Sequence, residues 1–249
     1  MDEETDPIKK MEIRMEKSKQ SSMLVWYPKI KGLDIPQPKT TILNIPPSVS
    51  RSIGTHGPMP EGMIGEIYDN AESIGYPLFV RTDHTSVKHS WSKTCFVEKE
   101  EQLMVHIWNI FESMECMMDI PFNALVFREY IDMDSKFCAF NGLPISKERR
   151  YFIRDGQVLC HHPYWPQDAI KFYDLDKPFT DEQWKEWLAE MNTETPDEIE
   201  LLTKYALMVG EVLPGHWSVD FCHGLNQKWY LIDMALADVS WHPEHVAER

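Results

Sequence analysis

Apolar residues recur every three or four positions in four stretches of this chain, and this spacing predicts amphipathic helices. Two of the stretches begin with a threonine followed three residues later by a glutamine or glutamate, which is the spacing of a capping box: Thr180 with Gln183, and Thr195 with Glu198. The predicted helices span Glu61–Ile74, Glu98–Met118 and the segments that follow Thr180 and Thr195. We interpret all of them as scaffold.

Short runs of β-branched and aromatic residues lie between these helices and predict strands. One pair is joined by Asp155-Gly156, a strong hairpin-turn signal. Strands and helices mixed in this order are typical of an α+β fold. The predicted strands are Met23–Tyr27, Leu78–Val80 with Arg81 at its end, Cys95–Val97, Asn123–Ile131, Ser146–Ile153 and Gln157–His161.

The segment Gly215–Trp241 is predicted to form two strands joined by a turn, because apolar and polar positions alternate on either side of a polar stretch. Each strand carries one acid, Asp220 in the first and Asp233 in the second. Two carboxylates side by side across a hairpin are costly unless a cation neutralises them, which indicates a divalent metal site. The alternative is a pair of turn or edge aspartates.

The N-terminal part of the chain has a different composition. Residues 1–22 are charged and polar and are predicted to be a mobile tail or a marginal helix. Residues 23–60 are rich in proline, which favours extended or turn backbone over helix. The chain starts without a secretory signal and contains no apolar run of membrane-spanning length, so we expect a cytoplasmic protein with no membrane partner.

The composition limits the classes of function. With 249 residues and 43% hydrophobic residues, the chain can bury a substantial core. Its formal net charge of -15 argues against broad nucleic-acid binding, although Lys29, Lys31 and Lys39 form a small basic strip. The five cysteines are scattered, without the spacing of a zinc site or a disulfide framework, and are interpreted as reduced packing residues.

Candidate anion-binding residues follow two of the predicted strands. Arg81 ends one strand, and the polar loop after it carries Ser86 and Lys88, which could lie over phosphate groups or could belong to an ordinary hairpin loop. In the strand Ser146–Ile153, Glu148 and Arg150 share one face because neighbouring residues in a strand point to opposite faces. Arg149 faces the other way, so at most one of the two arginines points into a given cleft.

Taken in order, these motifs resemble the signature of the ATP-grasp superfamily. The stretches VRTDHTSVKHSW, SKERRYFIRDGQV, VDF and WYLIDM look most like the branch that contains the cell-division-cycle assembly factor of eukaryotic translation initiation factor 2. The resemblance covers Glu61 to Asp238. It implies an α+β fold of two lobes that hold ATP between antiparallel sheets, with residues 61–131 as the first lobe and 132–249 as the second.

The resemblance also implies roles for individual residues, with ATP and Mg²⁺ as cofactors. Arg81, Ser86 and Lys88 would contact the phosphates, and the linker of Arg128, Glu129, Tyr130 and Ile131 would contact the adenine. Asp132 or Asp134 would bind the ribose. Arg150 would face the terminal phosphate with Glu148 beside it, which makes Arg150 and Lys88 the candidate catalytic residues. Asp220 and Asp233 would hold magnesium.

Departures from the family pattern leave the reaction open. Ala235 stands where an asparagine ligand is usual, and Ser218 stands where ligases often have an arginine that stabilises the reaction intermediate. The first hypothesis is an ATP- and magnesium-dependent ligase that activates a carboxylate, or an equivalent acceptor, and joins it to a nucleophile. The second is an ATP-binding assembly factor for a protein partner with little catalysis. A nucleic-acid-end ligase or kinase is a third.

Overall fold

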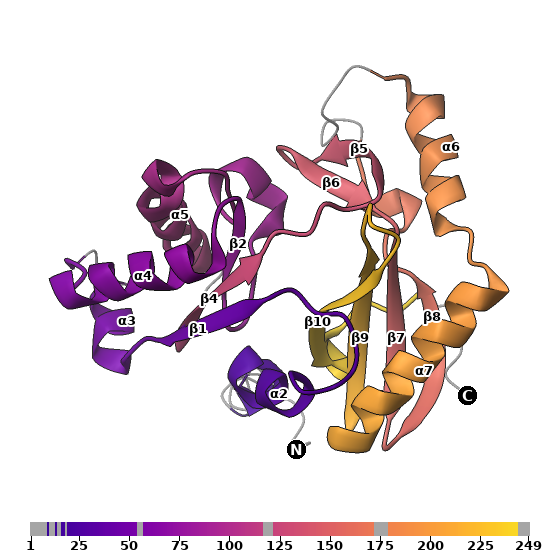
Figure 1. Ribbon diagram of the computed structural model, residues 1–249, viewed down its shortest axis with the longest axis horizontal. Helices are drawn as coiled ribbons and strands as arrows, with labels where there is room; N and C mark the ends of the chain where they lie inside the picture. The colour runs from indigo at the N-terminus through magenta and orange to yellow at the C-terminus, as the bar shows by residue number, and fades with distance from the viewer. Residues whose placement is uncertain are drawn as a thin grey trace.

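In the computed structural model, two four-stranded antiparallel sheets face each other across the molecule, with strand orders β1-β4-β2-β3 and β10-β9-β7-β8 (Figure 1). A separate two-stranded sheet, β5-β6, lies at one end of the second one. This mixed architecture with antiparallel sheets confirms the predicted α+β fold class. The structure describes residues 19–53, 57–116, 122–171 and 179–243, and a few positions before residue 19.

The first sheet is covered by helices whose apolar faces form one core with it. Ile67 of α4, Leu103 of α5 and Phe127 of β4 are among the fully buried residues of this core. The helix predicted from Glu61 ends at Gly75, whose φ of 90° suits glycine. The elements of this half are β1 (Thr40–Asn44), α3 (Pro47–Ile53), α4 (Glu61–Ile74), β2 (Leu78–Thr82), β3 (Phe96–Val97), α5 (Leu103–Cys116) and β4 (Ala124–Glu129).

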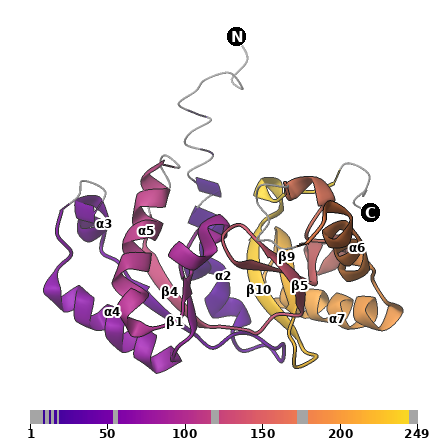
Figure 2. The ribbon, with the colours of Figure 1, turned by 90° about the horizontal axis from the view of Figure 1, so that it is seen from above.

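The second sheet carries α7 along one face, as Figure 2 shows from above. Tyr151, Val219 and Phe221 point from the strands into the core beneath this helix. The hairpin β5-β6 was not predicted from the sequence. The elements of this half are β5 (Ser135–Ala139), β6 (Leu143–Ser146), β7 (Glu148–Arg154), β8 (Gln157–Pro163), α6 (Asp181–Asn192), α7 (Pro196–Val212), β9 (His216–His223) and β10 (Trp229–Leu236).

The strand predicted at Met23–Tyr27 is wrong, because this segment belongs to the helix α2 (Met23–Ile30). Met23, Trp26 and Ile30 lie at helical spacing and are fully buried against the core of the second sheet. The Ser22 side chain accepts a hydrogen bond from the Leu24 N–H (3.2 Å) and caps the helix. Burial of this apolar face outweighs the effect of Pro28, which the proline-based prediction weighted more heavily.

The remaining N-terminal predictions have mixed outcomes. Most of the predicted tail, residues 1–22, lies outside the described residues, as do Met117 and Met118 of the predicted second helix. The extended backbone expected among the prolines is found in β1, which pairs with β4. Residues 23–60 therefore contribute to the cores of both sheets, while the division of the chain into lobes stays a prediction. None of the described helices is long and apolar enough to cross a membrane.

The capping boxes were predicted correctly at one helix and only in part at the other. Thr180 and Gln183 exchange both hydrogen bonds at the start of α6. At α7 the Thr195 hydroxyl accepts from the Glu198 N–H (3.3 Å), but the Glu198 carboxylate pairs with the buried Arg149 instead of returning to the cap. The charge of Arg149 has no water around it, so it takes the nearest carboxylate.

Candidate functional site

A pocket of about 660 Å³ lies where the two sheets face each other. Residues from both halves of the molecule line it, and the sequence predicted many of them. The predicted residues in its lining are Arg81, Ser86, Lys88, Arg128, Glu129, Tyr130, Ile131, Glu148, Asp220 and Asp233. The fold therefore brings together residues that lie more than a hundred positions apart in the chain.

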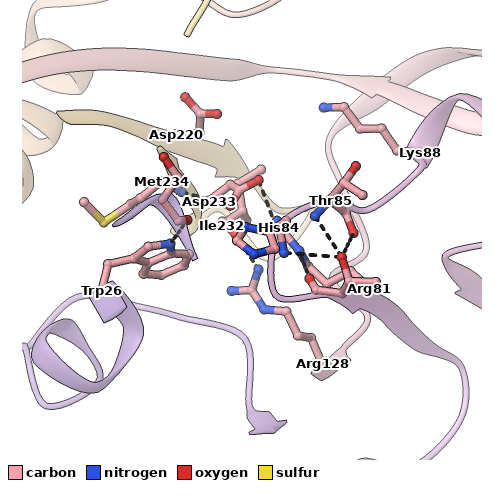
Figure 3. Close-up of polar contacts among 12 residues, drawn as sticks. Trp26, Arg81, His84, Thr85, Lys88, Arg128, Asp220, Ile232, Asp233 and Met234 are labelled. Atoms are coloured by element: carbon pink, nitrogen blue, oxygen red, sulfur yellow. Dashed lines mark hydrogen bonds and ion pairs between the residues drawn. The ribbon is translucent and has the colours of Figure 1, made fainter. Parts of the chain in front are cut away.

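Asp220 of β9 and Asp233 of β10 are direct cross-strand partners, as the hairpin pattern predicted. Each of them already contacts an arginine. Arg150 donates to both oxygens of Asp220, from Nε to Oδ1 (2.8 Å) and from Nη2 to Oδ2 (2.7 Å). Arg81 Nη1 lies 2.8 Å from Oδ2 of Asp233, and Figure 3 shows this contact at the centre of the site. The two carboxylates are thus neutralised by guanidinium groups of the protein itself.

The chemistry of this donor set fits magnesium that arrives with phosphate groups. Carboxylate oxygens are hard ligands, and each keeps a second lone pair besides the one used in its hydrogen bond. The remaining oxygen of the pair, Asp233 Oδ1, accepts from the Met234 N–H (2.9 Å). Among the described residues, no group of three or more His, Cys, Asp or Glu side chains is placed to hold a metal ion by itself. Asp220 and Asp233 would therefore share such an ion with oxygens of a ligand.

The cationic wall of the pocket consists of Arg81, Arg128 and Lys88. Arg128 is buried and donates to the Ile232 carbonyl and to the Thr40 hydroxyl (3.3 Å), so a side chain of the first sheet bonds to the second (Figure 3). Burial, together with the neighbouring charge of Arg81, lowers the pKa of Arg128 to about 10. An anion placed between these cations would relieve that repulsion.

Lys88 lies on the loop after β2 and reaches the second half of the molecule. Its ammonium donates to the Tyr164 hydroxyl (3.1 Å). Burial opposes the charge of this ammonium, but the attraction of Tyr164 and Glu148 outweighs burial and raises the pKa of Lys88. Lys88 is therefore a full positive charge at the rim of the pocket.

Glu148 presents an unsatisfied oxygen to this region. Its Oε1 accepts from the Ser146 hydroxyl (2.8 Å) and the Trp165 indole N–H (2.9 Å), whereas its buried Oε2 has no hydrogen-bond partner. A buried carboxylate oxygen without a donor is costly, and such atoms mark places where a ligand or cation binds.

The two arginines of β7 face opposite sides of the sheet, as predicted. Arg149 is fully buried and pairs with Glu198 and, at 3.6 Å, with Glu194. Arg150 does not line the pocket itself; it contacts Asp220 and the ring of Tyr164, which do. Arg149 is thus a structural cation on the α7 side.

Two predicted residues are not brought into the site. Asp132 and Asp134 are absent from the pocket lining, and the Asp134 carboxylate contacts His223 Nδ1 (2.9 Å) instead. The isolated bridge between Met133 and Gly224 turns this stretch toward the tip of the β9–β10 hairpin. The structure therefore gives no support to either aspartate as a ribose ligand.

Sequence reasoning missed the remaining walls of the pocket. Aromatic rings pack along one side, with Trp91 stacked on Phe96 (5.7 Å between centroids) and Phe96 against Tyr130 (4.9 Å). Their spacing carries no periodic signal, because they come from separate loops and strands. The missed lining residues include Phe79, His84, Thr85, Trp91, Met133, Leu143, Tyr164, Cys222 and Ile232.

Two antiparallel sheets over a pocket with cations on one side and paired acids on the other define the ATP-grasp class of fold. The chain belongs to an ATP-grasp domain family, the third family of its clade, whose family model matches residues 70–249.

Solved structures agree with this family at the level of fold. Cdc123 from Schizosaccharomyces pombe is 14% identical, with 89% of this chain and 85% of that chain covered and a TM-score of 0.54. Its C-terminally truncated form gives a TM-score of 0.56 at the same identity and coverage. The D-alanine–D-alanine ligase from Bacillus anthracis complexed with ATP is 13% identical, with 86% of this chain and 54% of that chain covered and a TM-score of 0.47. No curated protein matches the sequence.

Proposed function

We propose that this protein binds ATP together with magnesium in the pocket between the sheets and uses it, as an ATP-grasp ligase, to activate a carboxylate or an equivalent acceptor. The observation that carries the proposal is the convergence of Arg81, Arg128 and Lys88 with Asp220 and Asp233 around one pocket. A cluster of guanidinium and ammonium groups beside paired carboxylates suits a triphosphate that carries a metal ion.

The phosphates would compete with the aspartates for the arginines. Arg81 and Arg150 now donate to Asp233 and Asp220, and a phosphate can accept the same donors with two oxygens. The carboxylates released in this way gain lone pairs for magnesium, which supplies additional charge neutralisation when bound. Lys88 and Arg150 would then stabilise negative charge that develops as the terminal phosphoryl group moves to an acceptor oxygen.

The adenine would occupy the aromatic end of the pocket. Tyr130 and Phe96 provide flat apolar surface there. The Glu129 N–H already donates to the Lys39 carbonyl (2.8 Å), so the edge of the base would meet the backbone of Tyr130 and Ile131. This assignment keeps the predicted linker and moves its contacts to its C-terminal end.

A second candidate function is an ATP-binding assembly factor for a protein partner. It is favoured by the segment that follows β10, which lies over the sheet face beside Arg150. The Ser240 hydroxyl lies 2.7 Å from that of Ser218, the Trp241 carbonyl accepts from Arg150 Nη1 (3.2 Å), and the ring of His242 packs 4.8 Å from Phe152. A small acceptor that approaches Arg150 along this face would meet the segment, so ATP could serve to order a surface instead.

Product analysis with labelled ATP and magnesium tests the proposal. Release of ADP supports phosphoryl activation, whereas release of AMP indicates adenylation. ATP binding with neither product supports the assembly factor, especially if capture of a partner depends on ATP. Absence of ATP binding in the presence of magnesium contradicts both functions. Binding of RNA or DNA ends at low salt would instead support the nucleic-acid-end ligase, and the cytoplasmic location expected from the sequence is part of the proposal.

A further inference from the structure

The ring of Tyr164 contacts two cations that come from different halves of the molecule. Tyr164 follows β8, and the ammonium of Lys88, on the loop after β2, lies 4.3 Å from its ring centroid and donates to its hydroxyl (3.1 Å). The guanidinium carbon of Arg150 lies 4.6 Å from the same centroid. One aromatic side chain therefore fixes the distance between a loop cation and a sheet cation.

Tyr164 is itself held in place. Its backbone N–H donates to the Glu148 carbonyl (3.0 Å), and its ring packs against Trp165 with 5.0 Å between centroids. Trp165 donates to Glu148 Oε1 (2.9 Å), accepts at its carbonyl from the Asn192 side chain (2.8 Å), and offers a second ring face to Lys88 at 4.7 Å. The contact surface for Lys88 is thus rigid before any ligand is considered.

The loop that carries Lys88 is strained at the preceding residue. Val87 has φ 51° and ψ 34°, a left-handed conformation that a β-branched side chain rarely adopts. It persists because the Val87 side chain is buried and its carbonyl accepts from the Thr94 hydroxyl (3.0 Å) and the Ser90 N–H (3.1 Å). The contact between Lys88 and Tyr164 opposes relaxation of this strain at the neighbouring residue.

We propose that Tyr164 is a positioning residue that holds Lys88 and Arg150 in register for the phosphate groups of the nucleotide. The ligand in this statement rests on the proposed function. The contact itself joins protein side chains and can be tested alone. A cation–π contact of this kind contributes about 0.5 to 2 kcal/mol, so loss of the ring corresponds to roughly a tenfold effect.

The test compares Tyr164→Leu, which removes the ring, with Tyr164→Phe, which keeps the ring and loses the hydroxyl. Hydrogen exchange of residues 84–90 is measured on the full chain in the absence of nucleotide, together with trypsin cleavage after Lys88. We expect exchange and cleavage about tenfold faster in Tyr164→Leu and within about threefold of wild type in Tyr164→Phe. Tyr230→Leu removes a half-buried tyrosine at the end of the β9–β10 turn and should leave both rates unchanged.

Binding measurements with ATP, inorganic tripolyphosphate and adenosine provide the second readout. Tyr164→Leu should weaken ATP and tripolyphosphate by the same factor, about tenfold, and leave adenosine unaffected, because only the phosphate cations depend on the ring. Tyr164→Phe should restore most of the affinity.

Unchanged exchange of residues 84–90 in Tyr164→Leu overturns the proposal, and so does an equal loss of adenosine and tripolyphosphate binding. If exchange responds as expected but the wild-type protein binds neither ATP nor tripolyphosphate, the proposed function fails. The positioning contact then stands, and its phosphate ligand is overturned.

Discussion

Arg150 and Asp220 face each other across β7 and β9 and share two hydrogen bonds of 2.8 and 2.7 Å between one guanidinium and one carboxylate. Both side chains are nearly buried, with 11% and 7% of their surface exposed. The pair joins the residue expected at the terminal phosphate to a residue expected at the metal. Stability and ligand binding therefore depend on the same two side chains.

Asp220→Asn should lower the free energy of unfolding by about 3 kcal/mol, because it leaves the Arg150 charge buried without its carboxylate. Denaturant unfolding followed by circular dichroism measures the change. The double variant Arg150→Met/Asp220→Leu replaces both charges by apolar groups of similar size and should recover most of the loss. If the single variant unfolds at the wild-type midpoint, the pair contributes nothing to the fold.

Asp233→Asn should separate ATP binding from its magnesium dependence. The side chain of Asp233 is 37% exposed and is held by Arg81, so its loss removes a metal ligand and frees a cation for phosphate. In thermal-shift titrations, magnesium should raise the stabilisation by ATP in the wild type and add little in Asp233→Asn, while chelation with EDTA makes the two proteins alike. A magnesium increment equal to that of the wild type would exclude Asp233 as a ligand.

Stability should fall with acid in a way that depends on His162. Burial, with a further contribution from Arg150 and His242, lowers the pKa of His162 from 6.5 to about 4. The unfolded chain therefore binds more protons between pH 6.5 and 4, and folding free energy is lost progressively as the pH falls through this window, by about 2 kcal/mol. Unfolding of His162→Gln across the same window should show a smaller slope. Parallel pH profiles would mean that this imidazole titrates normally.

Thr195 and Glu198 should contribute to stability independently at the start of α7. Thr195→Ala removes the cap and should cost about 1 kcal/mol. Glu198→Gln leaves the cap intact and removes the charge that neutralises buried Arg149, and should cost about 3 kcal/mol. Chemical denaturation of both single variants and the double variant measures the two contributions. A double variant no worse than Glu198→Gln would mean that the two residues act as one capping unit.

Two glycine-to-alanine changes in helices should have opposite signs. A Cβ at Gly210 of α7 would lie 2.9 Å from Cα of Gly156 in the β7–β8 turn, so Gly210→Ala should cost about 1 to 3 kcal/mol. A Cβ at Gly65 of α4 meets nothing within 4 Å, so Gly65→Ala should stabilise by about 0.7 kcal/mol through helix propensity. Melting temperatures of the two variants provide the comparison. Equal effects would mean that α7 does not approach the turn so closely.

The periodic pattern was sufficient for elements whose local and tertiary preferences agree. α4, α7 and the hairpin of β9 and β10 follow it closely, since their apolar positions at helical or alternating spacing are the ones that are buried. The helix α2 was missed because its apolar positions at Met23, Trp26 and Ile30 stood among prolines. Its conformation depends on a core formed by residues almost two hundred positions later.

The sequence by itself determined the fold class, the pairing of Asp220 with Asp233 and the opposite faces of Arg149 and Arg150, because side-chain direction in a strand alternates regardless of what surrounds it. Only the tertiary structure decided that Arg81 and Arg150 neutralise those aspartates, that Asp132 and Asp134 lie outside the pocket, and that Tyr164 contacts Lys88. These contacts join separate elements across the cleft. Their distances depend on how the two sheets pack, and no local spacing in the chain encodes that packing.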